Sequence, residues 1–531
     1  MSRSHDRAAE ISVLVSILFL AGYLRLSNVS QNPGWYSDEG TILNITQNIL
    51  EGRWQYMAIN QSTLIAARLP LFPLLLAGAS RLFGPGIGTL RTLTGALGVL
   101  SVGLVYLFVR QVLGRQGAAL ALISALILAI YPSAILYSRF GFSYNLLPPL
   151  ALLGALWIWK YQETGQKRWM ILACSMIGIG ALSDIVMLTL AIPLFLVILI
   201  HRARDIAIAA LITLLPSIIF ALTMMASAPE AFLFDAQFTL SRLSQIPLIA
   251  QFPLAVISFG TLPIWDPWLA AGLIGLFMLR QSQLRWLALG LFILPILFLG
   301  RTGIGFTGVG FYYLIPVLPI ACIGIGALLR YGAPAVEEMT RNSLKGLRGR
   351  IPAAGIGIPS DWLETRLIAL GASLLLFIVM ISPLLASVYT TIDNVEQGFP
   401  TPVDPVILDP QDAISAANFV NVSTRSDDLV IASPALAWTL DARVADFQQA
   451  LIAEGVDTIH LPGNLPSDRF AYDTRYSQAR FVVIDPIWRN WAVHNMVEVA
   501  AMMSEVETWE LAFKAGELEV YENPRIKGPG L

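Results

Sequence analysis

The sequence predicts a polytopic α-helical membrane protein with a small soluble α/β domain at its C-terminal end. Of the 531 residues, 56% are hydrophobic and only 13% are charged, and many apolar runs are too long for a soluble core. Basic residues gather in alternate connections between these runs, as the positive-inside rule expects of cytoplasmic loops. From about residue 409 the composition changes to that of a water-soluble chain.

The apolar runs predict about eleven membrane spans. They lie at about residues 11–27, 90–110, 118–136, 146–160, 169–183, 185–200, 206–225, 267–280, 286–300, 312–330 and 366–389. Because the basic connections alternate, an odd number of spans places the N-terminus in the cytoplasm and the C-terminal part outside. We therefore expect a transmembrane domain over residues 1–390 and an extracytoplasmic α/β domain over residues 391–531.

The first external loop, residues 28–89, contains a segment that imitates a further span. Residues 64–83 are apolar, but four residues interrupt them, namely Arg68, Pro70, Pro73 and Arg81. If this segment spanned the membrane, most basic loops would lie outside, so we expect helices in the membrane interface instead. Two further external connections, residues 137–145 and 226–266, face the same compartment.

The soluble domain shows alternating strand and helix patterns. Helices are expected at residues 411–420, 445–454 and 491–503, and strands at residues 429–432, 458–461 and 481–484. This alternation predicts a small Rossmann-like domain. The domain lacks a glycine-rich phosphate loop, which favours a lid or docking role over a nucleotide site.

Composition excludes several classes of function. A net charge of −2 with no basic stripe gives no support for nucleic-acid binding. Cys174 and Cys322 fall in apolar spans, where they read as small core residues. The four histidines are scattered without the spacing of metal ligands.

Two adjacent carboxylates, Asp38 and Glu39, stand just beyond the first span. Ionised groups near a membrane are costly unless they are used, paired or hydrated. Ser37 or Asp38 is a good N-cap for a helix that runs to about Leu50, and a purely structural capping role is one interpretation. The dipole of that helix also favours a carboxylate that accepts a proton or holds a cation. The pair therefore marks a candidate active site.

The expected helix has two different faces beyond the acidic pair. Isoleucines fall on one face and amides on another, with Ile42, Ile45 and Ile49 against Asn44, Gln47 and Asn48.

Four arginines are expected on the same external side: Arg68, Arg91, Arg139 and Arg301. Each alone fits an arginine that reaches the headgroup region. Together, beside one acidic loop, they suit a phosphate group carried by a lipid. Tyr312 and Tyr313 could add hydroxyl donors or belong to the interfacial aromatic belt.

These motifs resemble the GT-C glycosyltransferases, and most closely the protein O-mannosyltransferases and the lipid A aminoarabinose transferases. The shared features are an Asp-Glu pair in a long first loop, an interfacial helix with proline, an arginine that opens the second span, Ser-Arg after the third span, a tyrosine-rich entry to a late span and an outer C-terminal domain. The resemblance covers about residues 10–390 and is strongest over residues 32–139.

The resemblance implies an enzyme that transfers a sugar, with inversion, from a polyprenyl-phosphate donor to an extracytoplasmic hydroxyl. Asp38 would be the catalytic base and Glu39 its neighbour. The groups near the donor phosphate would be Arg68, Arg91, Arg139, Arg301, Tyr312 and Tyr313. The acceptor would be a protein, lipid or glycan. The absence of long external domains of eukaryotic type favours a bacterial plasma membrane as the location.

Two departures from the family pattern bear on this assignment. Relatives often carry two prolines after the position of Arg68, whereas this chain has Pro70 alone. They also often place an acid about five residues after Ser-Arg, where this chain has Tyr144 and Asn145. Use of a divalent metal, Mg²⁺ or Mn²⁺, therefore stays open, and Asp184 is a candidate second acid.

Two rival interpretations come from other classes. A transporter of lipid-linked substrates would also carry polar groups in the membrane, but we find no inverted repeat in the sequence. A non-catalytic scaffold derived from a transferase would explain the missing acid near Asn145.

Overall fold

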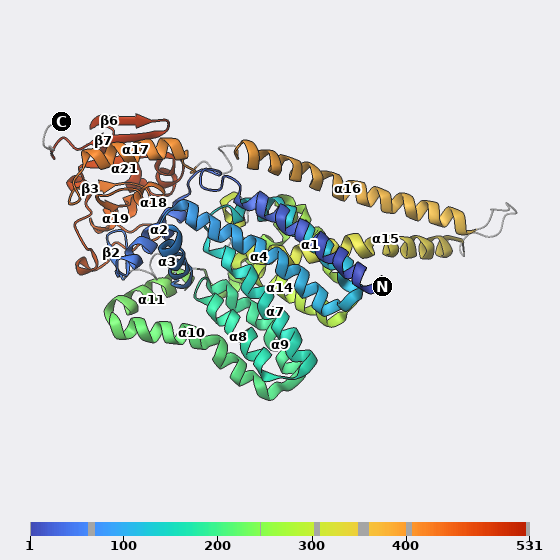
Figure 1. Ribbon diagram of the computed structural model, residues 1–531. Coiled ribbons are helices and arrows are strands. Elements are labelled where there is room, and N and C mark those ends of the chain that lie inside the picture. The colour runs from blue at the N-terminus through green and yellow to red at the C-terminus, as the bar shows by residue number, and fades with distance from the viewer. Residues whose placement is uncertain are drawn as a thin grey trace.

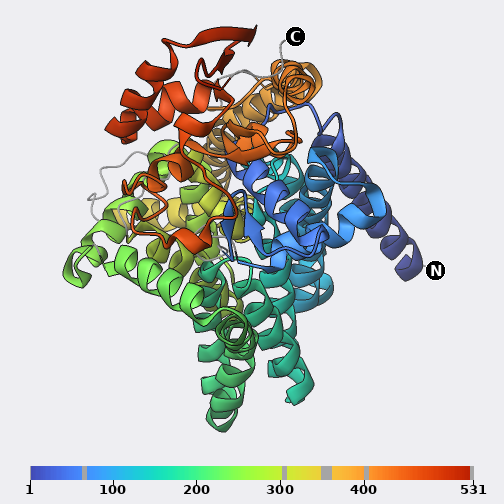
Figure 2. The ribbon, with the colours of Figure 1, turned by 90° about the vertical axis from the view of Figure 1, so that its left-hand side faces the viewer.

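The structure is a computed structural model that describes residues 2–61, 69–244, 246–301, 308–348, 361–399 and 406–526. A helical body fills most of the molecule, and the C-terminal domain stands at one end of it (Figure 1). A view from that end shows the red and orange domain lying against the blue N-terminal part of the chain (Figure 2).

The body is built from sixteen α-helices in the described residues, with short 3₁₀ turns and one small hairpin. The helices are α1 (Ser2–Leu26), α2 (Ser37–Leu50), α3 (Leu71–Phe83), α4 (Ile87–Leu113), α5 (Ala118–Ile130), α6 (Pro132–Ser138), α7 (Leu147–Thr164), α8 (Lys167–Ala181), α9 (Ala191–Arg202), α10 (Ile206–Ser227), α11 (Pro229–Ser244), α12 (Leu248–Trp265), α13 (Pro267–Phe277), α14 (Ser282–Gly300), α15 (Leu318–Arg348) and α16 (Asp361–Gln397). The 3₁₀ turns are η1 (Gly114–Gly117), η2 (Ser143–Leu146), η3 (Ile185–Leu190), η4 (Ala203–Asp205) and η5 (Gly308–Val317), and the hairpin pairs β1 (Gln55–Tyr56) with β2 (Ile59–Asn60).

All eleven predicted spans fall on helical segments, but their number as separate spans is not confirmed. In the described residues, five helices are long and apolar enough to cross a membrane, and two bent helix pairs raise this to seven at most. Several predicted spans are interrupted, for example at Tyr131 between α5 and α6. The chain is thus a multi-pass membrane protein.

The external connections contain more helix than the sequence suggested. α3 has 13 residues, so its length of about 20 Å is too short to cross about 30 Å of hydrocarbon, as expected for an interfacial helix. Residues 226–266 were expected to be a connection, yet they form α11 and the apolar α12, which bends by 105° into α13. Pro253 and Pro263 lie inside α12, and such prolines made a helix hard to foresee.

Glycine permits the close packing of α13 against α15 in the core of the body. A Cβ added at Gly275 would overlap the carbonyl oxygen of Gly324, and one at Gly324 would overlap the carbonyl oxygen of Gly272. Small residues let membrane helices approach each other closely enough for dispersion contacts.

The C-terminal domain is a five-stranded mixed sheet with helices. Its elements are α17 (Pro410–Ser423), β3 (Leu429–Ile431), α18 (Pro434–Ala437), β4 (Arg443–Ala445), α19 (Phe447–Ile452), η6 (Ser467–Arg469), η7 (Tyr476–Gln478), β5 (Phe481–Ile484), η8 (Trp488–Ala492), α20 (Val493–Asn495), α21 (Val497–Val506), β6 (Glu510–Ala515) and β7 (Leu518–Glu522). The strand order is β4-β3-β5-β7-β6, with the first three parallel and the last two antiparallel to their neighbours.

A small sheet lies near the C-terminal end as predicted, but one of the expected strands does not form. Residues 458–461 form a turn in which Thr458 N donates to the Leu461 carbonyl, so the expected strand there is wrong. The third parallel strand is instead β4. It ends at Ala445, which is the first residue of the segment expected to be helical. The C-terminal hairpin of β6 and β7 was missed because the sequence pattern was followed only as far as residue 503.

The C-terminal domain docks on the acidic loop through the carboxyl edge of its parallel strands. α18 follows β3 and packs against α2, where Gly40 is needed because a Cβ would overlap the Pro434 carbonyl. Beyond β4, Asp446 accepts a hydrogen bond from the Tyr56 hydroxyl at 3.2 Å. Parallel α/β sheets usually bind ligands at this edge, whereas here the first loop of the body covers it.

Two further contacts hold the domain to the body. Trp35 and Leu408 exchange backbone hydrogen bonds of 2.8 and 2.9 Å. Arg469 binds both carboxylate oxygens of Asp235 on α11 at 3.1 Å, and both side chains are buried. The domain therefore lies at the same end of the molecule as the acidic pair.

Candidate active site

The acidic loop enters α2 through a capping contact made by Glu39. The helix begins at Ser37 with Tyr36 as its N-cap, and the Glu39 carboxylate accepts from the Tyr36 backbone N–H at 3.1 Å. A Glu at the third helical position commonly reaches back in this way. The expected N-cap, Ser37 or Asp38, is thus one or two residues too late.

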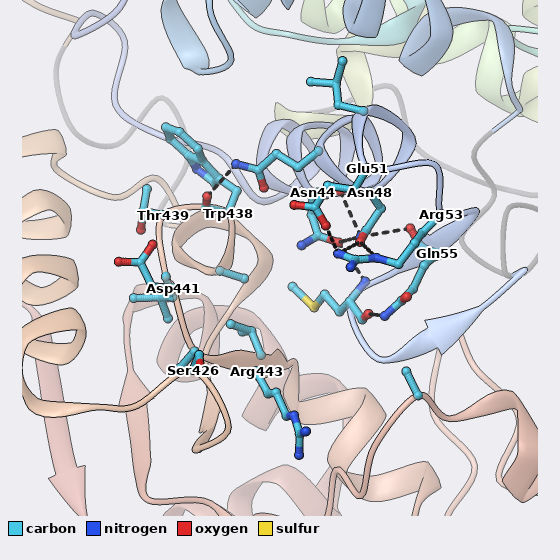
Figure 3. A pocket seen from close by; sticks show the side chains of 18 of the residues that line it. Asn44, Asn48, Glu51, Arg53, Gln55, Ser426, Trp438, Thr439, Asp441 and Arg443 are labelled. Carbon is cyan, nitrogen blue, oxygen red and sulfur yellow. Dashed lines mark hydrogen bonds and ion pairs between the residues drawn. The ribbon is translucent and has the colours of Figure 1, made fainter.

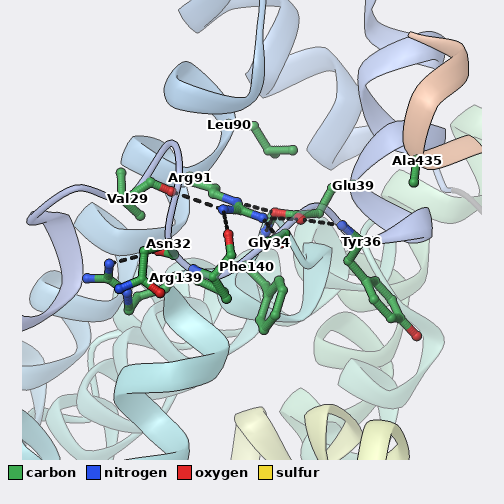
Figure 4. A network of polar contacts seen from close by, with 12 residues as sticks. Val29, Asn32, Gly34, Tyr36, Glu39, Leu90, Arg91, Arg139, Phe140 and Ala435 are labelled. Carbon is green, nitrogen blue, oxygen red and sulfur yellow. Dashed lines mark hydrogen bonds and ion pairs between the residues drawn. The ribbon is translucent and has the colours of Figure 1, made fainter. Parts of the chain in front are cut away.

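Glu39 is completely buried and bound to Arg91 of α4 (Figure 4). Arg91 Nε and one terminal nitrogen donate to the two carboxylate oxygens at 2.7 and 2.6 Å. The backbone N–H of Gly141 donates to the same carboxylate at 2.7 Å. Such a two-pronged pair, with further hydrogen bonds, compensates the cost of burying both charges.

The remaining N–H groups of Arg91 bind the backbone of the acidic loop. They donate to the carbonyl oxygens of Val29, Pro33 and Gly34 at 3.1, 2.6 and 2.7 Å. All five guanidinium N–H groups are therefore used. These contacts argue against the predicted role of Arg91 in binding phosphate, because no donor is left for a ligand.

Arg139 is also buried, and it binds carbonyl groups. Its terminal nitrogens donate to the carbonyl oxygens of Leu24, Ser27 and Asn32 at 2.7–2.9 Å. The guanidinium thus ties the end of α1 and the start of the acidic loop to the segment after α6. Its burial, with 0% of the residue exposed, likewise argues against direct phosphate binding.

Asn145 stands near the position where relatives often have an acid, and it holds this same segment. Its amide nitrogen donates to the carbonyl oxygens of Tyr137, Phe140 and Phe142 at 2.9–3.2 Å. A carboxylate could not donate to these oxygens. The departure from the family pattern therefore has a local structural consequence.

Asp38 has a different environment from its neighbour. It is half-buried in the first turn of α2 and interacts electrostatically with the Tyr312 hydroxyl. The Tyr36 ring, two residues earlier, contacts the ring of Phe142 at 5.5 Å between centroids. Phe142 in turn stacks on Tyr312 at 4.5 Å.

Tyr312 and Tyr313 thus lie near the acidic loop, in an aromatic cluster that the sequence showed only in part. Their ring centroids lie 4.3 Å apart, and Tyr144 contacts both rings at 5.5 and 5.3 Å. Aromatic pairs at these distances attract each other beyond simple burial. The cluster joins three chain segments around Asp38.

The other predicted site residues make local contacts or lie outside the described residues. Arg301 ends α14 and is partly buried, with its guanidinium 3.6 Å from the Phe298 ring centroid and a hydrogen bond to the Phe298 carbonyl. Asp184 caps η3 by accepting from Val186 N at 2.8 Å. Arg68 lies outside the described residues.

The donor set near the acidic pair does not fit a multi-acid metal site. Within the residues that the structure describes, no group of three or more His, Cys, Asp or Glu side chains could hold a metal ion. Glu39, the nearest second acid in sequence, has its oxygens occupied by Arg91 and two backbone N–H groups. Use of a divalent metal by this chain stays a prediction.

A further buried arginine, Arg25, was not foreseen from the sequence. Arg25 in α1 donates to the carbonyl oxygens of Leu128 and Ala129 at the end of α5, both at 2.8 Å. An arginine near the end of an apolar span reads as a residue that reaches the headgroups. Only its position among neighbouring helices shows that it binds helix-end carbonyls instead.

Comparison with known proteins identifies the architecture. Residues 67–228 match the family model of dolichyl-phosphate-mannose-protein mannosyltransferases. The structure is similar to ArnT from Cupriavidus metallidurans bound to undecaprenyl phosphate, with 17% identity and a TM-score of 0.58, over 98% of this chain and 99% of that chain. The chain has the same fold as ArnT.

A second GT-C structure shares the arrangement more distantly. The oligosaccharyltransferase AglB from Archaeoglobus fulgidus, in complex with an inhibitory peptide and a dolichol-phosphate, has 13% identity and a TM-score of 0.51 over 91% of this chain and 70% of that chain. A comparison with curated protein sequences gave no match. The resemblance drawn from the acidic loop and arginine motifs is thereby confirmed.

Proposed function

We propose that this chain is a membrane glycosyltransferase that moves a sugar from a polyprenyl-phosphate donor to an extracytoplasmic hydroxyl, with inversion. The GT-C fold and the match to the mannosyltransferase family model support this class. Two of the similar structures are complexes with a polyprenyl phosphate, namely undecaprenyl phosphate in ArnT and a dolichol-phosphate in AglB. These complexes support the donor type.

The observation that carries the proposal is the unequal environment of the two adjacent acids. Glu39 is buried and fully engaged by Arg91 and two backbone N–H groups. Asp38 is half-buried beside the tyrosine cluster. A pair in which one acid fixes the loop and the other faces a partly open, aromatic environment suits a positioned base.

Asp38 would accept the proton of the acceptor hydroxyl as its oxygen attacks the anomeric carbon. The bond from that carbon to the phosphate oxygen breaks, and the lipid phosphate leaves with the bonding electrons. General base catalysis of this kind contributes roughly 10²- to 10⁴-fold. The rest of the acceleration would come from holding both substrates in place.

Arg301 and the two tyrosines are the groups that we assign to the leaving phosphate. Apart from the Phe298 carbonyl, no hydrogen-bond acceptor for the Arg301 guanidinium is found in the described residues, and Tyr312 lies within electrostatic reach of Asp38. Preorganised donors of this kind stabilise charge as it develops. Arg68 remains a proposed phosphate ligand on sequence grounds alone.

Arg91 and Arg139 are positioning residues in this proposal, in place of the phosphate contacts expected from the sequence. Both hold backbone carbonyl groups of the acidic loop. We assign Asp184 a structural role as the N-cap of η3. The non-catalytic scaffold, motivated by Asn145, is the main alternative, because loss of an acid can accompany loss of activity.

Turnover of lipid-linked sugar donors separates these possibilities. The purified protein in lipid nanodiscs is mixed with a radiolabelled polyprenyl-phosphate sugar pool and a membrane extract that supplies acceptors. We expect label to move from the lipid to an acceptor and polyprenyl phosphate to be released. Donor that binds but is never consumed would favour the scaffold, and label that only changes leaflet would favour a transporter.

The role of Arg301 has its own test in the same assay. Arg301→Ala should raise the KM for the donor, while Arg301→Lys should recover only part of the loss, since a point charge replaces a planar fork. Arg285→Ala, which removes a partly buried arginine near the start of α14, is the matched control. Equal KM values for all three variants would remove Arg301 from the donor site.

A further inference from the structure

A large cleft lies between α2 and the C-terminal domain, and neither residue of the acidic pair lines it. Its volume is about 810 Å³, within the range of sites that hold small ligands. One wall is α2 with the β1–β2 hairpin, and the other is the segment around β4 (Figure 3).

The α2 wall consists of the amide face that the sequence pattern had separated from the isoleucine face. Asn44, Gln47 and Asn48 line the cleft, and at 100° per residue this face is turned by roughly 120° from Asp38. Along the helix axis Asn44 lies about 9 Å from Asp38, at 1.5 Å per residue. The cleft is therefore a separate site on the same helix.

The amides of this wall are held in place by one another. Asn44 Oδ1 accepts from the Met57 backbone N–H at 2.7 Å and from Asn48 Nδ2 at 3.2 Å. Arg53 donates twice to Asn48 Oδ1, at 3.1 and 2.9 Å. A polar wall fixed in this way needs little further ordering when a ligand binds.

The acidic and basic residues that line the cleft are equal in number. Two acids, Glu51 and Asp441, and two bases, Arg53 and Arg443, line it, so their formal charges sum to zero. Aromatic rings stand among them, since Trp438 and Tyr472 are also in the lining. A neutral ligand with many hydroxyl groups and apolar faces matches amides, balanced charges and rings.

The edge strand of the sheet is closed to a peptide. β4 is the last strand of its sheet, and an exposed edge could add an extended peptide. The Tyr472 hydroxyl blocks this at Val444, where it donates to the carbonyl oxygen at 2.7 Å and accepts from the N–H at 3.2 Å. The backbone groups that a peptide strand would use are already paired.

We infer that this cleft is a carbohydrate-binding subsite, which holds sugar residues of a neutral glycan acceptor remote from the reacting hydroxyl. The inference rests on the proposed function in one respect, that the bound glycan is the acceptor of the transferred sugar. Binding of a glycan to the cleft depends neither on the donor nor on sugar transfer. It narrows the acceptor class from protein, lipid or glycan to glycan.

Binding to an array of short neutral oligosaccharides, without donor, tests the inference. The full-length protein in nanodiscs is compared with Asp441→Ala/Arg443→Ala, which removes two exposed side chains, and with Ser426→Trp, which fills the cleft from an exposed loop. Glu498→Ala/Lys514→Ala removes one exposed acid and one exposed base elsewhere in the domain and serves as the matched control.

We expect the wild type and the control to retain a subset of oligosaccharides. Both cleft variants should bind them at least about ten-fold more weakly. The double variant loses one or two hydrogen bonds to charged groups, and Ser426→Trp fills the space that the glycan would occupy. No retained oligosaccharide, or unchanged binding in both cleft variants, would overturn the inference. Retention of peptides on a parallel peptide array, lost in the cleft variants, would assign the cleft to a protein acceptor instead.

A second comparison separates this inference from the proposed function. Asp38→Asn should retain oligosaccharide binding, because Asp38 does not line the cleft. Normal glycan binding by a wild-type protein that transfers no sugar would leave the subsite standing and defeat the transferase.

Discussion

At the scale of single residues, the two adjacent acids have different environments and different proposed roles. Sequence alone placed Asp38 and Glu39 at a helix start but treated them as one acidic pair. Glu39 and Arg91 are both buried, with side chains 0% exposed, whereas Asp38 is half-buried and interacts electrostatically with Tyr312. A pattern of residue types cannot show which of two neighbours points into the protein, because that depends on where α4 crosses the loop.

The Glu39–Arg91 pair should be essential for folding. Glu39→Gln leaves a buried guanidinium without its counter-charge, and breaking a buried pair on one side costs about 3–5 kcal/mol. Thermal unfolding in detergent should show this loss for Glu39→Gln and for Arg91→Gln. The double variant should lose less than the sum of the single variants, since neither partner is then left charged and alone. Additive losses would show that the two side chains do not act as a pair.

At the scale of elements, the carboxyl edge of β3, β4 and β5 has become an interface with buried acids. Asp485 follows β5, and its carboxylate accepts from Ile487 N at 2.9 Å, from Trp488 N at 3.3 Å and from the Ser433 hydroxyl. Burial raises the pKa of Asp485 to about 6 and that of Asp446 to about 6. The alternation of strands and helices predicted this edge of the sheet. It did not predict that α2 packs on the edge, because α2 lies hundreds of residues earlier in the chain.

These raised pKa values predict that the C-terminal domain loses stability as pH rises. The native state binds protons more tightly than the unfolded chain between pH about 4 and about 6, so stability is fully present below pH 4 and is lost through pH 6. The rise of each pKa to about 6 corresponds to about 3 kcal/mol per carboxyl. Hydrogen exchange of β5 amides, corrected for intrinsic pH dependence, should become faster over this window.

Asp485→Asn is the variant that isolates this effect. The amide oxygen can still accept from the backbone N–H groups and its nitrogen can donate to Ser433, so the fold should persist. The slope of β5 stability against pH should fall, and stability at pH 7 should rise. An unchanged slope would show that Asp485 does not titrate in this range. Asp409→Asn, an exposed helix cap in the same domain, provides the comparison.

At the scale of the whole molecule, hydropathy predicted a helical membrane body and composition predicted a separate α/β domain. Charge patterning also predicted that the domain and the acidic loop share one side, and their direct contact at Gly40 and Asp446 agrees with this. The span count was less predictable, because bent pairs such as α12 and α13 have ordinary apolar sequences. The aromatic cluster required packing of three segments that no local pattern links.

Cysteine labelling tests the orientation of this assembly. Ser467→Cys in the C-terminal domain is exposed, and Gln116→Cys lies exposed in a connection expected to be cytoplasmic. The native Cys174 and Cys322 are buried, so background labelling should be low. We expect an impermeant maleimide to label Ser467→Cys in intact cells and Gln116→Cys only after permeabilisation. The reverse result would place the acidic loop in the cytoplasm.

The central claim is that Asp38 accepts a proton during sugar transfer, and Asp38→Asn tests it most directly. Asp38 is not the N-cap of α2, so the substitution removes a proton acceptor without removing a cap. The measurement is the single-turnover rate of sugar transfer from a polyprenyl-phosphate donor, beside thermal unfolding of the same preparation. We expect the rate to fall by about 10²-fold or more with unfolding nearly unchanged. Wild-type transfer by a stable Asp38→Asn protein would contradict the account.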